Sequence, residues 1–123
     1  MKICILSTGA IEASPVGYKG IERITWQIAD WLGKRGHEVY LIAPKGSQRG
    51  NFNLIETVPA GYIIPGIIDT DREHVIKAID KLKDQNFDCL QVHTQRFFLE
   101  IFWIKAKRYE WHIHGWLPFF PPN

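Results

Sequence analysis

Uninterrupted apolar runs limit how this chain can fold more than any other feature. One run covers residues 3–6, and a second lies within residues 38–43. Strands of this kind are buried on both faces, as in the parallel sheets of α/β proteins. Between them, apolar residues recur at helical spacing over residues 20–35, and Gly36 is a stop signal. A strand, a helix and a strand in this order predict a parallel β-α-β unit.

The rest of the chain continues the alternation of strands and helices. We expect further strands at 52–58, 87–93 and 111–114, and further helices at 70–85 and 95–108. Pro44 is expected to end the second strand, because proline cannot donate to a sheet ladder. Thr70 and Glu73 have the spacing of a capping box at the start of the second helix.

Each helix should bury one face. The stripe of the first helix that is expected to face inward comprises Ile21, Ile24, Thr25, Ile28, Trp31 and Leu32. In the second helix the corresponding residues are Val75, Ile76, Ile79 and Leu82. The helix at 95–108 carries apolar residues all round, so we expect it to be buried, or else to meet a partner or a membrane surface.

These elements predict an α/β fold. We expect one Rossmann-like domain over residues 1–123, a doubly wound parallel sheet of about five strands with helices on both faces. Right-handed crossovers favour the strand order 3-2-1-4-5. The winding then reverses between strands one and four, so the loops after Leu6 and Val92 flank one crevice. Residues 9–20, 93–96 and 114–115 should gather there.

Composition excludes some functions. A net charge of +2 with scattered Lys and Arg gives no argument for nucleic-acid binding. Cys4 and Cys89 lie inside apolar runs, so we interpret them as reduced, buried thiols, which fits a cytoplasmic protein. The start of the chain lacks the apolar core of a signal peptide, and no apolar run is long enough for a membrane span. Peripheral membrane contact stays open.

The loop between the first strand and the first helix is rich in glycine. Gly9, Gly17 and Gly20 lie between an apolar strand and a helix start, where bare N–H groups and the helix dipole favour anions. Their spacing is not that of a dinucleotide fingerprint or a P-loop. The alternative is a plain connection that needs left-handed residues.

Histidines and one acid are the other candidates. His93, His112 and His114 suggest a metal site, but no further ligand is placed to complete one, and we expect no metal and no cofactor. His93 and His114 could instead hydrogen-bond a polyhydroxylated ligand, or cap strand ends. Glu22 could orient a ligand hydroxyl, or be an acid favoured in a first helical turn.

Four segments carry a family resemblance. They are residues 15–23 (Pro-Val-Gly-Tyr-Lys-Gly-Ile-Glu-Arg), 32–39 (Leu-Gly-Lys-Arg-Gly-His-Glu-Val), 87–93 (Phe-Asp-Cys-Leu-Gln-Val-His) and 112–115 (His-Ile-His-Gly). In this order, after a first strand, they resemble the N-terminal, acceptor-side domain of GT-B glycosyltransferases of the family 4 type. Lys19 stands where that family usually has the first of two glycines.

The resemblance implies transfer of a sugar from a nucleotide-sugar, with retention of configuration. It implies that Gly17, Lys19 and Gly20 approach the donor diphosphate, and that His114 touches the transferred sugar as the catalytic residue. The remaining candidate contacts to acceptor or sugar are Glu22, His93, Thr94 and Arg96. The nucleotide-sugar is expected to be the donor substrate and not a cofactor. The acceptor is expected to be a saccharide or a lipid-linked molecule.

The family's C-terminal, donor-binding domain has no counterpart in residues 1–123. We therefore expect a donor-binding domain or subunit as partner and little activity from the isolated chain, which leaves open whether it is an enzyme by itself. The apolar, proline-rich residues 116–122 are expected to meet a partner, and to drive homo-oligomers when it is absent; the alternative is that they cover the core of this domain. The alternative function is a small α/β module that binds an anion or another protein without catalysis.

Overall fold

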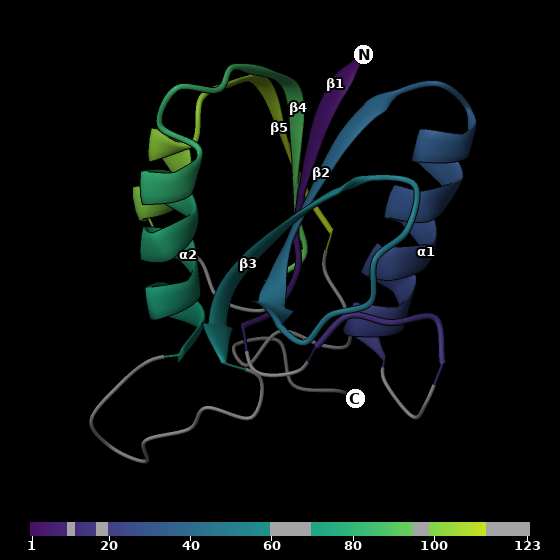
Figure 1. The fold of residues 1–123 in the computed structure, drawn as a ribbon. Coiled ribbons are helices and arrows are strands. Elements are labelled where there is room, and N and C mark those ends of the chain that lie inside the picture. Colours follow the sequence, from purple (N-terminus) through teal and green to yellow (C-terminus); the bar gives the residue numbers. More distant parts are fainter. Residues whose placement is uncertain (10–11, 17–19, 60–69, 95–98, 113–123) are drawn as a thin grey trace, which may run out of the picture.

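The computed structural model describes residues 1–9, 12–16, 20–59, 70–94 and 99–112. The elements follow each other along the chain as shown in Figure 1. They are β1 (Lys2–Leu6), α1 (Ile21–Lys34), β2 (Glu38–Lys45), β3 (Asn53–Pro59), α2 (Thr70–Lys81), β4 (Phe87–Val92), the 3₁₀ helix η1 (Leu99–Trp103) and β5 (Ala106–Trp111).

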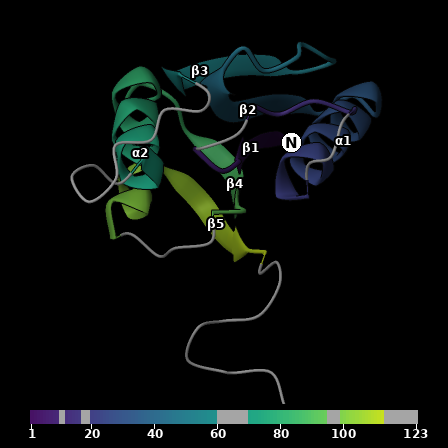
Figure 2. The same cartoon turned by 90° about the horizontal axis from the view of Figure 1, so that it is seen from below.

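The five strands form one parallel sheet in the order β3-β2-β1-β4-β5. This confirms the predicted doubly wound, Rossmann-like arrangement. Figures 1 and 2 show α1 on one face of the sheet, with α2 and η1 on the other. The chain changes face between β3 and β4, so the reversal of winding lies between β1 and β4 as expected.

Two apolar cores separate the layers. Under α2 and η1, the core contains Leu6, Ile42, Val75, Leu90 and Ile101 among others. Under α1, a smaller core is made by alternate residues of the central strands, including Ile5 and Leu41, together with Ala29 of α1. Because successive strand residues point to opposite faces, a continuous apolar run can serve both cores.

The second strand is longer than predicted. β2 passes through Pro44 and ends at Lys45, so the expectation that Pro44 ends it was wrong. β1 pairs with β2 only as far as Ile42, and the β2–β3 register shifts between Ala43 and Lys45. The missing N–H of Pro44 therefore falls where the ladder is already irregular, which a sheet tolerates.

The region after β4 was predicted wrongly. Instead of a helix at 95–108, the described residues form η1 and then β5, and β5 covers Ala106–Trp111 rather than 111–114. Ile101 and Ile104 are buried while Leu99 and Trp103 are exposed. Buried side chains at a spacing of three residues are expected for a 3₁₀ turn, because side chains i and i+3 lie on the same side of it. Tyr109 and Trp111, two residues apart on β5, both pack against the α2-side core, as strand periodicity requires.

Most of the residues predicted to face inward do so: Ile21, Thr25, Val75 and Leu82 are buried, and Ile28, Leu32 and Ile79 pack against the two cores. Ile24, Trp31 and Ile76 were expected inside but are 41%, 54% and 42% exposed. In α1 the buried positions are Ile21, Glu22, Thr25, Ala29 and Asp30, and in α2 they include His74, Val75 and Ala78. In each helix polar side chains replace some of the expected apolar ones. α2 also ends at Lys81, four residues before the predicted end.

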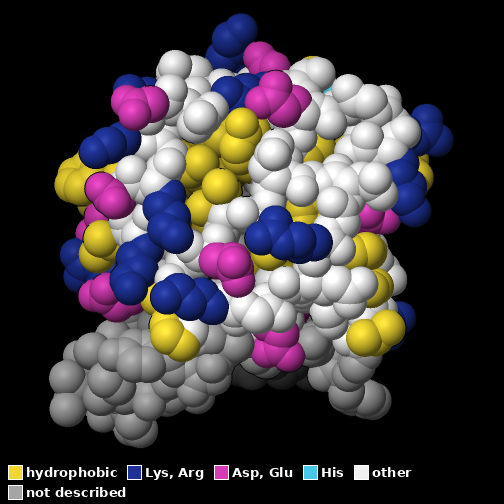
Figure 3. Space-filling view, viewed as in Figure 1, with side chains coloured by type: hydrophobic (Ala, Val, Ile, Leu, Met, Phe, Trp, Pro, Cys, Tyr) yellow, Lys and Arg dark blue, Asp and Glu magenta, His cyan; other side chains and the backbone are white. Residues whose placement is uncertain are grey.

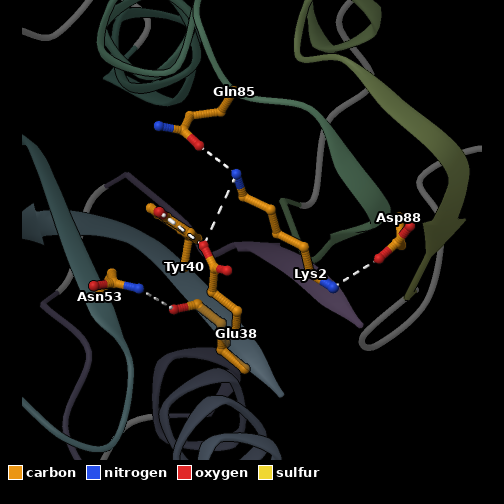
Figure 4. A network of polar contacts seen from close by, with 7 residues as sticks. Lys2, Glu38, Tyr40, Asn53, Gln85 and Asp88 are labelled. Carbon is orange, nitrogen blue, oxygen red and sulfur yellow. Dashed lines mark hydrogen bonds and ion pairs between the residues drawn. The ribbon is translucent and has the colours of Figure 1, made fainter.

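A polar network around Lys2 ties the amino ends of the central strands together (Figure 4). The Lys2 N–H donates to Asp88 Oδ2 over 2.8 Å, and its ammonium donates to the Gln85 side-chain oxygen. The ammonium also lies 3.9 Å from Glu38 Oε2, to which the Tyr40 hydroxyl donates. These contacts join β1 to β2 and β4, at the edge opposite the crevice.

Charged side chains of both signs are mixed over the described surface in Figure 3. On that face, Lys and Arg side chains lie next to one another at the left, with Asp and Glu side chains beside them. Within the same described part of the chain, no helix is long and apolar enough to cross a membrane.

Candidate functional site

The candidate site lies at the carboxyl edge of the sheet, where β1, β4 and β5 end together. Backbone pairing continues just past the strands: the His93 N–H donates to Leu6 O, and the His112 N–H to Val92 O, each over 2.9 Å. The Ser7 N–H similarly donates to Ile42 O over 3.0 Å. The residues after β1, β4 and β5 are thus held in register at the point where the winding reverses.

Buried polar side chains are concentrated at this edge. Among the described residues, all the buried polar or charged ones except Asp30 lie at the carboxyl ends of strands, in the loops that follow them, or in the first two turns of the helices: Ser7, Thr8, Ser14, Glu22, Thr25, Ser47, Thr57, His74, His93 and Thr94. Burying such groups costs free energy unless they are hydrogen-bonded. Because these polar side chains are clustered in spite of that cost, we take the carboxyl edge as the candidate ligand-binding site.

α1 holds the side chains of the turn after β1. The Thr8 hydroxyl donates to Glu22 Oε2 in the first turn of α1. Because the Thr25 hydroxyl donates to the Glu22 carbonyl over 3.1 Å, the Ser7 hydroxyl donates to Thr25 Oγ1 over 2.9 Å. A carboxylate has several acceptor positions, so Glu22 can also accept a hydrogen bond from a ligand hydroxyl.

α2 holds the backbone of the same turn. The Gly9 N–H donates to Asp71 Oδ1 over 2.7 Å. The Ser7 carbonyl accepts from His74 Nε2 over 2.7 Å, and since a carbonyl only accepts, the proton is on Nε2. Nδ1 is then bare and accepts the Thr57 hydroxyl proton. Burial lowers the pKa of His74 to about 4, although the bond to Ser7 opposes this shift, so the ring is neutral near pH 7.

Two histidine rings meet beside this turn. His93, fully buried after β4, stacks on His112 after β5, with 4.4 Å between ring centroids and 22° between planes. Thr94 is buried next to it. His112 Nε2 lies 3.8 Å from Glu110 Oε1. In the described ranges, no three His, Cys, Asp or Glu side chains are grouped so that they could hold a metal ion.

The structure brings some of the predicted site residues together. Gly20 is the N-cap of α1, and Glu22, His93 and Thr94 are buried at the carboxyl edge. Gly17, Lys19, Arg96 and His114 lie outside the described residues, as does the terminal aromatic segment at 116–122. Their predicted roles therefore stay predictions.

Sequence reasoning missed the contribution of α2. Asp71 and His74 were not singled out, although both contact the turn after β1. The sequence contained one signal, the spacing of four residues between His74 and Ala78, which places both on one helical face. In the structure both are buried. Asp71, three residues before His74, belongs to that face as well.

The sequence was compared with curated proteins and with models of protein families. No curated protein matches the chain significantly. The model of one protein family, Glycosyltransferase Family 4, matches residues 18–122. That match spans α1 through the end of β5 and includes the helix start, β4 and the histidines at the carboxyl edge. The chain therefore belongs to glycosyltransferase family 4.

Proposed function

We propose that this chain is the acceptor-side domain of a retaining GT-B glycosyltransferase that uses a nucleotide-sugar donor. The observation that carries the proposal is the set of buried polar side chains after β1, after β4 and at the start of α1, which share the carboxyl edge of the sheet at the reversal of winding. Thr8 and Glu22 are in contact there, and His93 and Thr94 are buried at the end of β4. Open α/β sheets bind ligands at such points.

Sugar transfer needs the departing nucleoside diphosphate to be stabilised as it gains negative charge. The start of α1 offers uncapped backbone N–H groups, since its N-cap, Gly20, makes no side-chain cap, and the helix dipole adds positive potential. We propose that Gly17, Lys19 and Gly20 lie along the diphosphate, with the Lys19 ammonium in place of a close glycine contact. His114 would contact the transferred sugar.

The acceptor would lie on the other side of the transferred sugar. Glu22, His93, Thr94 and Arg96 are proposed as its contacts or as contacts to the sugar. A carboxylate, a neutral imidazole and a hydroxyl together can both donate to and accept from sugar hydroxyls. This set suits a saccharide or the saccharide part of a lipid-linked acceptor.

We further propose that residues 1–123 act as one domain facing a donor-binding domain, in the same polypeptide or in a separate subunit. That domain would supply the nucleotide pocket and most of the charge opposite the diphosphate. We also propose a cytoplasmic location, in which the two free, buried cysteines, Cys4 and Cys89, would stay thiols. Affinity purification from the native source, with mass spectrometry of the bound proteins, tests for the separate subunit.

The binding proposal is tested by NMR on the ¹⁵N-labelled chain. Titration with UDP-glucose and with GDP-mannose should shift the amide signals of Gly20, Ile21, His93 and Thr94, and the free nucleosides should not. Saturable shifts at the crevice for at least one nucleotide-sugar support the proposal. Shifts confined to the opposite edge, around Lys2 and Asp88, or an equal response to the nucleosides, would rule it out.

A further inference from the structure

The turn after β1, residues 7–9, receives contacts from a helix outside the segments that carry the family resemblance. We infer that Asp71, in the first turn of α2, is a positioning residue for the crevice. Its carboxylate accepts a hydrogen bond from the Gly9 N–H. This bond holds the turn in place, and the turn contacts the start of α1 through Thr8 and Glu22. The inference rests on the proposed binding of a diphosphate at α1 and adds the element that keeps that site in shape.

The contacts of α2 bracket the turn. Asp71 Oδ1 accepts the Gly9 N–H over 2.7 Å at one end, and His74 Nε2 donates to the Ser7 carbonyl over 2.7 Å at the other. Asp71 and His74 are three residues apart and lie on one face of α2. A helix that holds both ends of a three-residue turn fixes the direction of its backbone.

The side chains of the turn transmit this constraint to α1. Thr8, between the two held residues, donates to Glu22, and Ser7 donates to Thr25. Glu22 lies in the first turn of α1 and Thr25 in the second. If the Gly9 N–H were released, Thr8 would lose its fixed orientation toward Glu22. The start of α1 would then be less well ordered for a ligand.

A competing interpretation predicts the opposite effect. A bare Gly9 N–H is the type of donor that binds phosphate, so the Asp71 carboxylate could instead occupy the place of an anion. In that case removing the carboxylate would open a donor and remove a negative charge, and anions would bind more tightly. A positioning role predicts weaker binding when the acceptor oxygen is lost, in spite of the lost charge.

The experiment uses the 123-residue chain and inorganic pyrophosphate, followed through the Gly20 and Ile21 amide signals by NMR. Asp71→Ala should raise Kd about fivefold or more, the effect of roughly one hydrogen bond. Asp71→Asn keeps an acceptor oxygen but not the charge, so its Kd should stay within about twofold of wild type or fall. Asp80→Ala, which removes an acid from the exposed face of α2, is the matched control and should not weaken binding. Melting temperatures should confirm that all three variants are folded.

Each outcome decides the matter. Weaker binding by Asp71→Ala with recovery in Asp71→Asn supports the positioning role, because a loss of charge alone would strengthen binding in both variants and would not weaken it in Asp71→Ala. Unchanged or tighter binding by Asp71→Ala overturns it and leaves the proposed function standing. If wild type itself shows no saturable shift, the proposed diphosphate site fails and this role fails with it. Should Asp71→Ala not fold, hydrogen exchange decides on chains that keep an acceptor oxygen: a Gly9 N–H that is protected in both wild type and Asp71→Asn supports the role, and an unprotected one in wild type overturns it.

Discussion

The buried His74 should make the protein sensitive to mild acid. Its pKa is about 4 in the folded state, against an ordinary value of 6.5. Between these pH values His74 is protonated in the unfolded chain but neutral in the folded chain. The free energy of unfolding therefore falls as the pH falls from 6.5 toward 4. At about 1.4 kcal/mol per pH unit the full loss is roughly 3 kcal/mol, of which about 2 kcal/mol is lost by pH 5.

Urea unfolding at pH 7.5 and pH 5.0 measures this loss, with His74→Gln as the test variant. The Gln amide can still donate to the Ser7 carbonyl, and the Thr57 hydroxyl can turn to the Ala43 carbonyl, 3.4 Å away. The stability of wild type should fall by about 2 kcal/mol more than that of His74→Gln between the two pH values. His37→Gln, at the opposite end of the sheet, retains His74 and should keep the wild-type loss. Equal losses in wild type and His74→Gln would refute the reasoning.

Three further predictions concern packing and the proposed site. Gly33→Ala should cost about 2 kcal/mol or more in urea unfolding, because a Cβ there would lie 1.6 Å from the Asn51 carbonyl oxygen, whereas Gly20→Ala, with nothing within 4 Å, should cost less than half as much. Lys19→Glu should weaken nucleotide-sugar binding by about tenfold or more with little change in melting temperature, since a loop lysine contributes little to stability; unchanged affinity would remove Lys19 from the site. With a donor-binding domain present, His114→Ala should lower kcat/KM by about 10²-fold, roughly 3 kcal/mol, and a folded variant with normal kinetics would leave His114 a structural role only.

The order of the strands could be read from the sequence because it depends on few rules. Continuous apolar runs such as residues 3–6 indicate burial on both faces, and right-handed crossovers then leave little choice of topology. The sheet order and the reversal between β1 and β4 follow from these two facts. The placement of Glu22, His93 and Thr94 at one edge follows in turn, because parallel strands share a carboxyl edge.

Local details failed where tertiary contacts outweigh pattern. The apolar stretch around Ile101 has helical composition, yet of its described residues, 99–104, only Ile101 and Ile104 are buried in the core. The residues that follow form the edge strand β5. Ile24 and Trp31 were expected on the inward stripe but are exposed, whereas Glu22, which was not on that stripe, is buried because the Thr8 hydroxyl donates to it. Hydropathy alone does not contain this information, since the partners are distant in sequence.

The same reasoning explains why the two ends of the sheet differ. At the amino edge, Lys2, Glu38 and Asp88 are partly exposed, and their contacts can be lost one at a time at small cost, as for other solvent-screened pairs. At the carboxyl edge, Ser7, Thr25 and His74 are buried, so a lost partner leaves an unsatisfied polar group inside the protein. An all-apolar packing there would avoid that risk, and the chain instead keeps polar groups that satisfy one another through α1 and α2. The buried side chains thus have hydrogen-bond partners within the protein, and the proposed sugar transfer would use the acceptor positions that remain at the carboxyl edge.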